Sequence, residues 1–152
     1  MIPQKLKLNK DFKPCQVDDN DEIYPNGFFK FNISKMTDYI SKNKDEFKLE
    51  SIQTSFYKKF ITVGLDEKTV LKADITKPVI LAEISPSKFN VIDGNHRVEK
   101  ACRDGKKEIM AYVLTVNQHL LFLTSVEAYK TYVEYWNEKV TEILKNKHAS
   151  VK

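Results

Sequence analysis

The stretch that decides the fold is FNVIDGNHRVEKACRDGKKEIMAYVL, residues 89–114. The apolar run Phe89–Ile92 predicts a strand, and Asp93-Gly94 predicts a tight turn after it. Val98, Ala101 and Cys102 then recur at helical spacing. Gly105 stands where a left-handed glycine commonly ends a helix, and Ile109–Leu114 predicts a second strand. We therefore expect a strand, a tight turn, a helix and a strand in succession.

The segments before this stretch predict further strands. Val79–Ile84 follows Pro78 as an apolar run, and the turn residues 85–88 join it to Phe89–Ile92, so a hairpin is expected. Residues 24–27, Tyr-Pro-Asn-Gly, predict a turn that leads into a strand at residues 28–32. Residues 47–53 are expected to be extended, whereas the signals between residues 56 and 77 are mixed and assign no element.

A helix is expected from Asn32 or Ser34, either of which can cap it, to about Asn43. Its apolar residues share one face; they are Ile33, Met36, Tyr39 and Ile40. With the strands, this pattern predicts an α+β fold in which a small mixed sheet is packed against helices. We expect one domain over residues 1–152, with its core in residues 24–115.

A long C-terminal helix is expected over about residues 124–146, beginning with a capping box formed by Thr124 and Glu127. An apolar stripe runs along this helix at residues Val126, Tyr129, Val133, Trp136, Val140 and Ile143. The stripe covers less than three heptads, which favours packing on the chain's own sheet over a dimer seam. A homodimer through this helix stays open as the alternative.

The composition sets broad limits on function. The chain has 152 residues, of which 41% are hydrophobic and 30% charged, so a real core is expected. Its longest apolar stretch, Leu120–Leu123, is far too short to span a bilayer, and no membrane partner is expected. No secretory signal or acylation motif is readable at the start of the sequence, and Cys15 and Cys102 show no metal-site spacing. We expect reduced thiols and a cytoplasmic location.

The formal net charge of +4 is spread evenly along the chain. Residues 1–76 carry 13 basic and 12 acidic residues, and residues 77–152 carry 12 and 9, so no nucleic-acid arm is indicated. The acidic run at residues 18–22 has calcium-loop alternation, but Ile23 and Phe29 stand where glycine and glutamate are needed, which excludes calcium. His119 and His148 are expected on the surface.

Asp93-Gly94-Asn95-His96-Arg97 carries the clearest chemistry. A helix that starts at a glycine turn exposes unpaired amides at its positive end, which favours an anion. Gly94 permits close approach of a ligand and Asn95 can cap the helix, while His96 and Arg97 add donors. Asp93 could hold Mg²⁺, orient His96 or accept a proton from an attacking hydroxyl. The alternative is structural: Asp93 and Arg97 pair across the turn while His96 bonds nearby backbone.

Residues 78–114 resemble the core motif of the ParB/sulfiredoxin superfamily, in which a strand enters a DG-x-HR turn followed by a helix, a glycine and a strand. Pro78-Val79-Ile80 also resembles the strand that precedes this motif. About half of the chain carries no specific motif of the family. The resemblance implies that Gly94, Asn95, His96 and Arg97 line a nucleotide phosphate site, with Asp93 supporting it or a metal.

The chain also departs from parts of this family. Asn95 occupies the position of the sulfiredoxin catalytic cysteine, and an amide cannot perform thiol chemistry, so sulfiredoxin activity is not expected. One helix after Leu123 is too few for the helix-turn-helix module of partitioning proteins, so a complete partitioning protein is not expected either. Other members with a DG-x-HR turn include ADP-dependent free-serine kinases and proteins described as nucleases. Those kinases use an upstream glutamate as base, and Glu22 is the candidate here.

Three functions follow as hypotheses. The first is a nucleotide-binding enzyme that hydrolyses or transfers a terminal phosphoryl group with Mg²⁺; its catalytic residues would be Asp93 and His96, and its phosphate site would include Arg97. The second is a DNA-binding or nuclease module, for which aromatic residues could stack on single strands although no basic patch is visible. The third is a non-catalytic nucleotide-sensing protein that pairs through the C-terminal helix.

Overall fold

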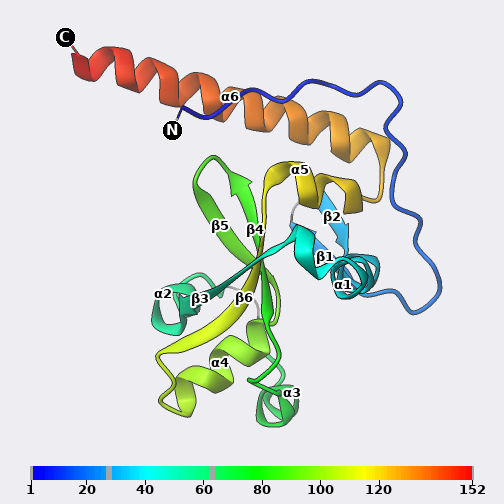
Figure 1. Ribbon diagram of the computed structural model, residues 1–152, viewed down its shortest axis with the longest axis vertical. Helices are drawn as coiled ribbons and strands as arrows, with labels where there is room; N and C mark the ends of the chain where they lie inside the picture. The colour runs from blue at the N-terminus through cyan, green and yellow to red at the C-terminus, as the bar shows by residue number, and fades with distance from the viewer. Residues whose placement is uncertain (1, 27–28, 62–63, 152) are drawn as a thin grey trace.

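The computed structural model describes residues 2–26, 29–61 and 64–151, without the side chains of residues 26 and 148–151. The chain forms two groups of strands with helices packed around them (Figure 1). In chain order the elements are β1 Ile23–Asn26, β2 Phe29–Asn32, α1 Ile33–Lys42, η1 Lys44–Glu46, β3 Lys48–Gln53, α2 Thr54–Lys58, α3 Glu67–Lys72, β4 Val79–Ser85, β5 Lys88–Asp93, α4 Asn95–Arg103, β6 Glu108–Leu114, α5 Val116–His119, η2 Leu120–Phe122 and α6 Val126–Val151.

The main sheet has the strand order β3-β6-β4-β5. β4 pairs with β5 as the expected antiparallel hairpin and with β6 in parallel, while β3 closes the other edge antiparallel to β6. The parallel pair arises because α4 carries the chain from the end of β5 back across the sheet to β6. β1 and β2 form a separate antiparallel pair. The predicted α+β class with a small mixed sheet is confirmed.

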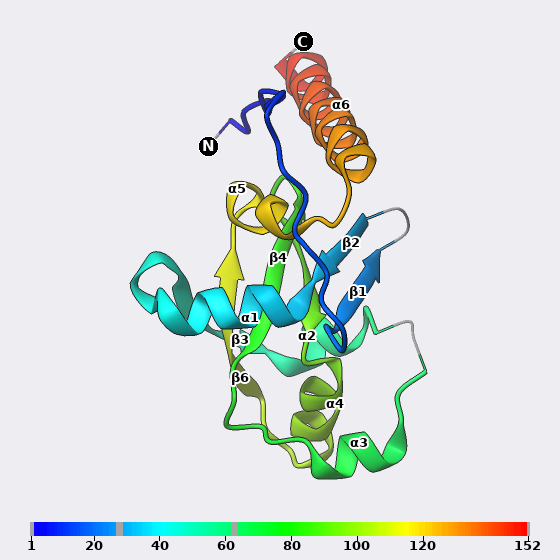
Figure 2. The same ribbon diagram turned by 90° about the vertical axis from the view of Figure 1, so that its right-hand side faces the viewer.

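Both faces of the main sheet are covered, and β4 shows this most clearly because every residue but Glu83 is buried. Ile80, Ala82 and Ile84 pack with the buried faces of α1, α5 and α6. Val79 and Leu81 point the other way and pack with Val98 and Ala101 of α4. Figure 2 shows α1 crossing in front of the strands, α6 above them and α4 near their lower end. The sheet therefore separates two apolar cores.

Several local predictions are confirmed with their physical causes. Asn32 caps α1, because its side-chain oxygen accepts the Lys35 N–H at 3.0 Å. At the other end of the motif, Gly105 has φ +73° and closes α4 in a Schellman arrangement, in which its N–H bonds the Cys102 carbonyl and the Lys106 N–H bonds the Ala101 carbonyl.

Other predictions are wrong or shifted. Ser125, not Thr124, caps α6, because its hydroxyl accepts the Ala128 N–H at 3.0 Å. The Thr124 N–H instead bonds the Lys30 carbonyl of β2, so no capping box forms there. Tyr24, Pro25 and Asn26 of the predicted turn lie inside strand β1. Gly27, the last residue of that turn, and Phe28, the first of the predicted strand, lie outside the described residues.

His119 is the clearest correction, because it is completely buried rather than on the surface. Its Nε2 lies 2.7 Å from the Glu83 carbonyl oxygen, and its ring meets Phe31 and Tyr132 edge to face. Since that carbonyl can only accept, Nε2 carries the proton and Nδ1 is bare. Burial lowers the pKa of His119 to about 4. The side chain of His148 lies outside the described residues.

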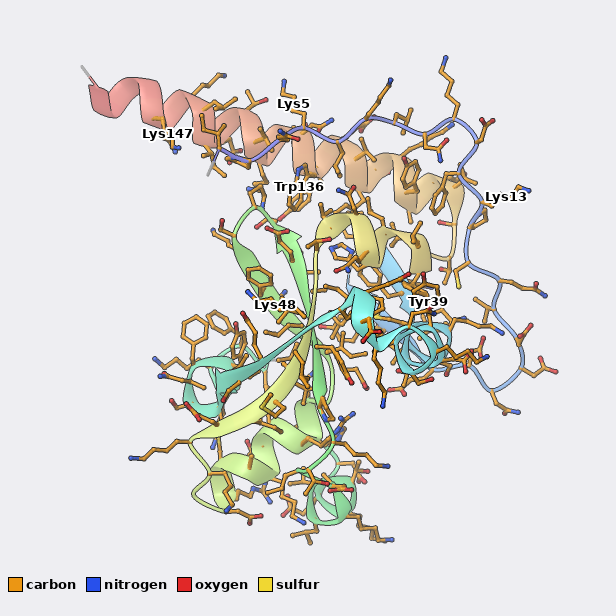
Figure 3. The ribbon with its side chains drawn as sticks, in the orientation of Figure 1. Lys5, Lys13, Tyr39, Lys48, Trp136 and Lys147 are labelled. Carbon is orange, nitrogen blue, oxygen red and sulfur yellow. The ribbon has the colours of Figure 1, made fainter. Side chains whose placement is uncertain are left out.

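The apolar stripe of α6 packs within the chain. Tyr129, Val133, Trp136 and Val140 are buried in the core beneath the helix, and the extended N-terminal segment runs along the helix (Figures 1 and 2). Trp136 points from α6 toward the rest of the molecule (Figure 3) and donates to the Gln4 carbonyl at 2.9 Å. Of the two sequence interpretations, packing on the chain's own domain is the one observed. The homodimer stays a prediction that this packing does not require.

Candidate functional site

The turn between β5 and α4 requires glycine at position 94. Gly94 is the N-cap of α4 and has φ +103°, a conformation that strains any side chain. A Cβ there would also lie 2.5 Å from Cγ1 of Val79 in the neighbouring strand. The turn is therefore pressed against the start of β4, which fixes where α4 begins.

The open end of α4 presents backbone donors. The first N–H bonded within the helix is that of Val98, which donates to the Gly94 carbonyl at 3.0 Å. The N–H groups of Asn95, His96 and Arg97 precede it and have no carbonyl available in the helix. Asn95 is the first helical residue rather than the cap that the sequence suggested, because Gly94 takes that position.

Asp93 and Arg97 form an ion pair across the turn. Nη2 of Arg97 lies 3.0 Å from Oδ2 of Asp93, and the two side chains are 19% and 17% exposed. Nη1 of Arg97 donates to the carbonyl of Pro78 and, at 3.3 Å, to that of Lys77. The guanidinium thus ties the start of α4 to the start of β4 while one side of the pair faces solvent.

His96 turns toward α3 and away from this pair. Its Nε2 accepts the N–H of Asp66, the N-cap of α3, at 3.2 Å. Together with the Asp93–Arg97 pair, this contact matches the structural alternative weighed for the motif. Proton transfer through Nε2 of His96 requires this contact to open first, because that nitrogen is occupied.

Glu22 is brought to the same place from the N-terminal segment. Its backbone is held on both sides by the first turn of α1: the Glu22 N–H donates to Oγ of Ser34 at 2.7 Å, and the Glu22 carbonyl accepts the Ile33 N–H at 2.8 Å. Although much of Glu22 is open to solvent, partial burial of its carboxyl group raises the pKa, and the charge of Asp93 raises it further. Arg97 and His96 act in the opposite direction.

These groups line an open cleft of about 890 Å³ between α1, β4 and the start of α4, called here the α1–α4 cleft. Asp93 and Arg97 of the motif line it, whereas Gly94, Asn95 and His96 do not. Sequence reasoning missed one wall, which is the polar face of α1: Ser34, Thr37, Asp38 and Ser41. These polar residues recur at spacings of three and four, away from the apolar face of the same helix, and this pattern could have predicted the wall. Apolar contact comes from Pro78, Ile80 and Tyr112.

The described residues contain no group of three or more His, Cys, Asp or Glu side chains that could hold a metal by themselves. Mg²⁺ commonly needs less from a protein, because one or two carboxylates suffice when a substrate supplies phosphate oxygens. Asp93 is such a carboxylate, and Glu22 lines the same cleft with a pKa that the charge of Asp93 raises. The donor set therefore fits a metal bound together with a phosphate ligand.

Comparison with known proteins gives no relative for this chain. No family model, no curated protein and no solved structure matches it. Within residues 2–26, 29–61 and 64–151, no helix is both long and apolar enough to cross a membrane.

Proposed function

We propose that the protein binds a nucleotide through its phosphates in the α1–α4 cleft and, with Mg²⁺, hydrolyses or transfers the terminal phosphoryl group. The observation that carries this proposal is that Glu22, from the N-terminal segment, meets Asp93 and Arg97 of the distant β5–α4 turn beside the open end of α4. The resemblance of residues 78–114 to the ParB/sulfiredoxin superfamily supports the same function, and membership of that superfamily is part of the proposal.

Charge and position assign a role to each group. The guanidinium of Arg97, at the positive end of α4, would bind phosphate oxygens, where it also stabilises charge that develops during transfer. Asp93 would hold Mg²⁺, which supplies further neutralisation of the phosphates when bound. Tyr112 and the apolar residues beside it offer a surface for the base, and the hydroxyls of α1 offer partners for sugar or acceptor groups.

Glu22 is the strongest candidate for the general base. In the transfer step an acceptor hydroxyl or water oxygen attacks the terminal phosphorus, the bond from phosphorus to the leaving phosphate oxygen breaks, and the proton of the attacking oxygen passes to Glu22. A carboxylate with a raised pKa holds that proton better than an ordinary one. The rigid attachment of its backbone to α1 keeps it facing the cleft.

A thermal-shift screen tests binding directly. The ligands are ATP, ADP, CTP, GTP and inorganic phosphate, each with and without Mg²⁺, because a ligand that binds only the native state raises the melting temperature. We expect one nucleotide to stabilise the wild type and to lose at least tenfold in affinity with Arg97→Ala, since a hydrogen bond to a charged group contributes roughly 1.5–3 kcal/mol. No shift with any ligand, or a change in affinity within about threefold, would show that the assignment is wrong.

A second variant separates binding from chemistry. Glu22→Gln keeps the shape and the backbone contacts of the residue but removes the base. We expect this variant to bind the nucleotide as the wild type does and to lose about 100-fold or more in turnover, in line with the usual contribution of a general base. Unchanged turnover would exclude Glu22 as the base.

The proposal includes a cytoplasmic location, where nucleotides and reduced thiols are both abundant. Cys15 and Cys102 are free thiols, which suits a reducing compartment. Alkylation of both thiols in freshly opened cells, before any reductant is added, would support this location, and their resistance to alkylation would contradict it.

A further inference from the structure

A basic and aromatic surface lies on the side of the main sheet that α4 covers, where α2 meets the end of α4. The turn after α4 and the helix α2 are 52 residues apart in the chain, yet buried Thr54 joins them. Its hydroxyl donates to the Lys106 carbonyl at 2.7 Å, and its N–H donates to the Lys107 carbonyl at 3.0 Å. Two lysine pairs that look unremarkable in the sequence are thereby placed together.

An open cleft of about 570 Å³ lies between these segments. Among the described residues that line it, the charged ones are all lysines: Lys58, Lys59, Lys106 and Lys107. The acidic group nearest to Lys58 is Glu99, 3.6 Å away, and Glu99 is also paired with Arg103. Asp104 and Glu108 flank the lysines in the sequence but do not line the cleft. The cleft is therefore positive in sign.

Two exposed phenylalanines, Phe56 and Phe60, neighbour Lys58 and Lys59 in the sequence of α2 and the turn after it, although neither lines the cleft. Tyr57 packs toward the core of the sheet, whereas Phe56 and Phe60 are 48% and 55% exposed. Their ring centroids are 5.2 Å apart at an interplanar angle of 62°, so the two rings do not cover one another face to face. The two rings are in contact with each other and both are exposed, so a ligand can reach both.

We propose that this surface, called here the α2 patch, binds a single-stranded nucleic acid. The α2 patch consists of Phe56, Lys58, Lys59, Phe60, Lys106 and Lys107. A flexible strand can lay its phosphates among the lysines and stack unpaired bases on the adjacent rings, which is how sequence-tolerant single-strand binding works in general. Paired bases offer no such faces, so a duplex would use the lysines alone.

The shape of the patch favours a strand over a membrane surface. The lysines line a hollow, which the flat surface of a bilayer does not enter, and α2 has only five residues, too few for an interfacial amphipathic helix. The α2 patch shares no residue with the α1–α4 cleft, so this proposal does not depend on the proposed nucleotide site.

Fluorescence anisotropy on the full chain tests the proposal with labelled 15-nucleotide strands of thymidine and of uridine and with a DNA duplex. We expect binding to a single strand, weakened about tenfold by Phe56→Ala and retained by Phe56→Tyr, which keeps the ring. The double variant Lys106→Ala/Lys107→Ala should reduce the slope of log affinity against log salt by about 1.4. Lys10→Ala/Lys13→Ala removes the same charge from an exposed segment and should change neither quantity.

Other outcomes would overturn the proposal. The proposal is wrong if neither strand binds, or if duplex and single strand bind with equal affinity and Phe56→Ala has no effect. It is also wrong if the two double lysine variants lose affinity equally. Binding to vesicles rich in phosphatidylserine, with no binding to the strands, would assign the patch to a membrane instead. Nucleotide thermal shifts should be unchanged in all these variants, which separates failure here from failure of the nucleotide site.

Discussion

Acid should destabilise this protein through one buried side chain, His119. The residue is neutral in the folded state, with its Nε2–H on the Glu83 carbonyl and no partner for Nδ1 among the described residues. Protonation would place a charge inside the core at a nitrogen with no acceptor. Because the folded pKa of about 4 lies below the ordinary value of 6.5, the unfolded chain binds the proton first as the pH falls.

The size of the effect follows from the two pKa values. Stability contributed by neutral His119 is complete above pH 6.5 and is lost progressively toward pH 4, where the loss approaches about 3 kcal/mol. At pH 5 the same relation gives about 2 kcal/mol. This is a large fraction of the 5–15 kcal/mol that holds a typical domain together.

Urea unfolding at pH 7 and pH 5 measures the loss, with His119→Gln as the reference. Glutamine can still donate to the Glu83 carbonyl but does not titrate, and all other ionisable groups are present in both proteins. We expect the wild type to lose about 2 kcal/mol more than His119→Gln between the two pH values. Equal losses would mean that His119 is not a neutral buried base, and the reasoning from its burial would fail.

Substitutions at three further positions test the fold. Gly94→Ala should cost about 2–4 kcal/mol in urea unfolding, since it combines a strained φ with a clash against Val79, and a cost below 1 kcal/mol would contradict the tight turn. Asn32→Ala should cost about 2–3 kcal/mol, because buried Asn32 caps α1 and also donates to the Gln16 carbonyl and to Asp21. Asn32→Asp keeps the cap acceptor but brings a buried carboxylate against Asp21 and the Gln16 carbonyl, so it should be no more stable than Asn32→Ala. Asn137→Ala removes both hydrogen bonds to the backbone of Leu6, so the Leu6 amide should exchange fast while amides in β4 still exchange slowly. If the Leu6 amide is as well protected in the variant as in the wild type, other contacts hold the N-terminal segment.

The parts of the fold that the sequence predicted correctly are those with local causes. The hairpin of β4 and β5 depends on adjacent turn residues, and α4 depends on a glycine at each end. α2 and α3 escaped prediction because they are five and six residues long, below the length at which periodicity is visible. α2 depends on the bonds of Thr54 to a distant turn, which no local pattern contains.

The candidate site shows the same division. Asp93, Gly94 and Arg97 were identified as neighbours in the chain, and their turn is where the motif placed it. Glu22 was only a candidate by position, because its approach to Asp93 depends on the bonds that α1 makes to its backbone. His119 was misplaced because the burial of this helical histidine depends on a partner in a distant element, the carbonyl of Glu83 in β4.

The two hydrogen bonds between Leu6 and Asn137, which join the N-terminal segment to α6, set an order of events during synthesis. Leu6 bonds Asn137, a residue made 131 positions later, so at roughly 5–20 residues per second the early segment waits on the order of ten seconds for its partner. During that interval residues 2–15 are an extended chain beside a sheet that is still being assembled. The N-terminal segment therefore reaches its final place only after α6, which holds it, has been synthesised.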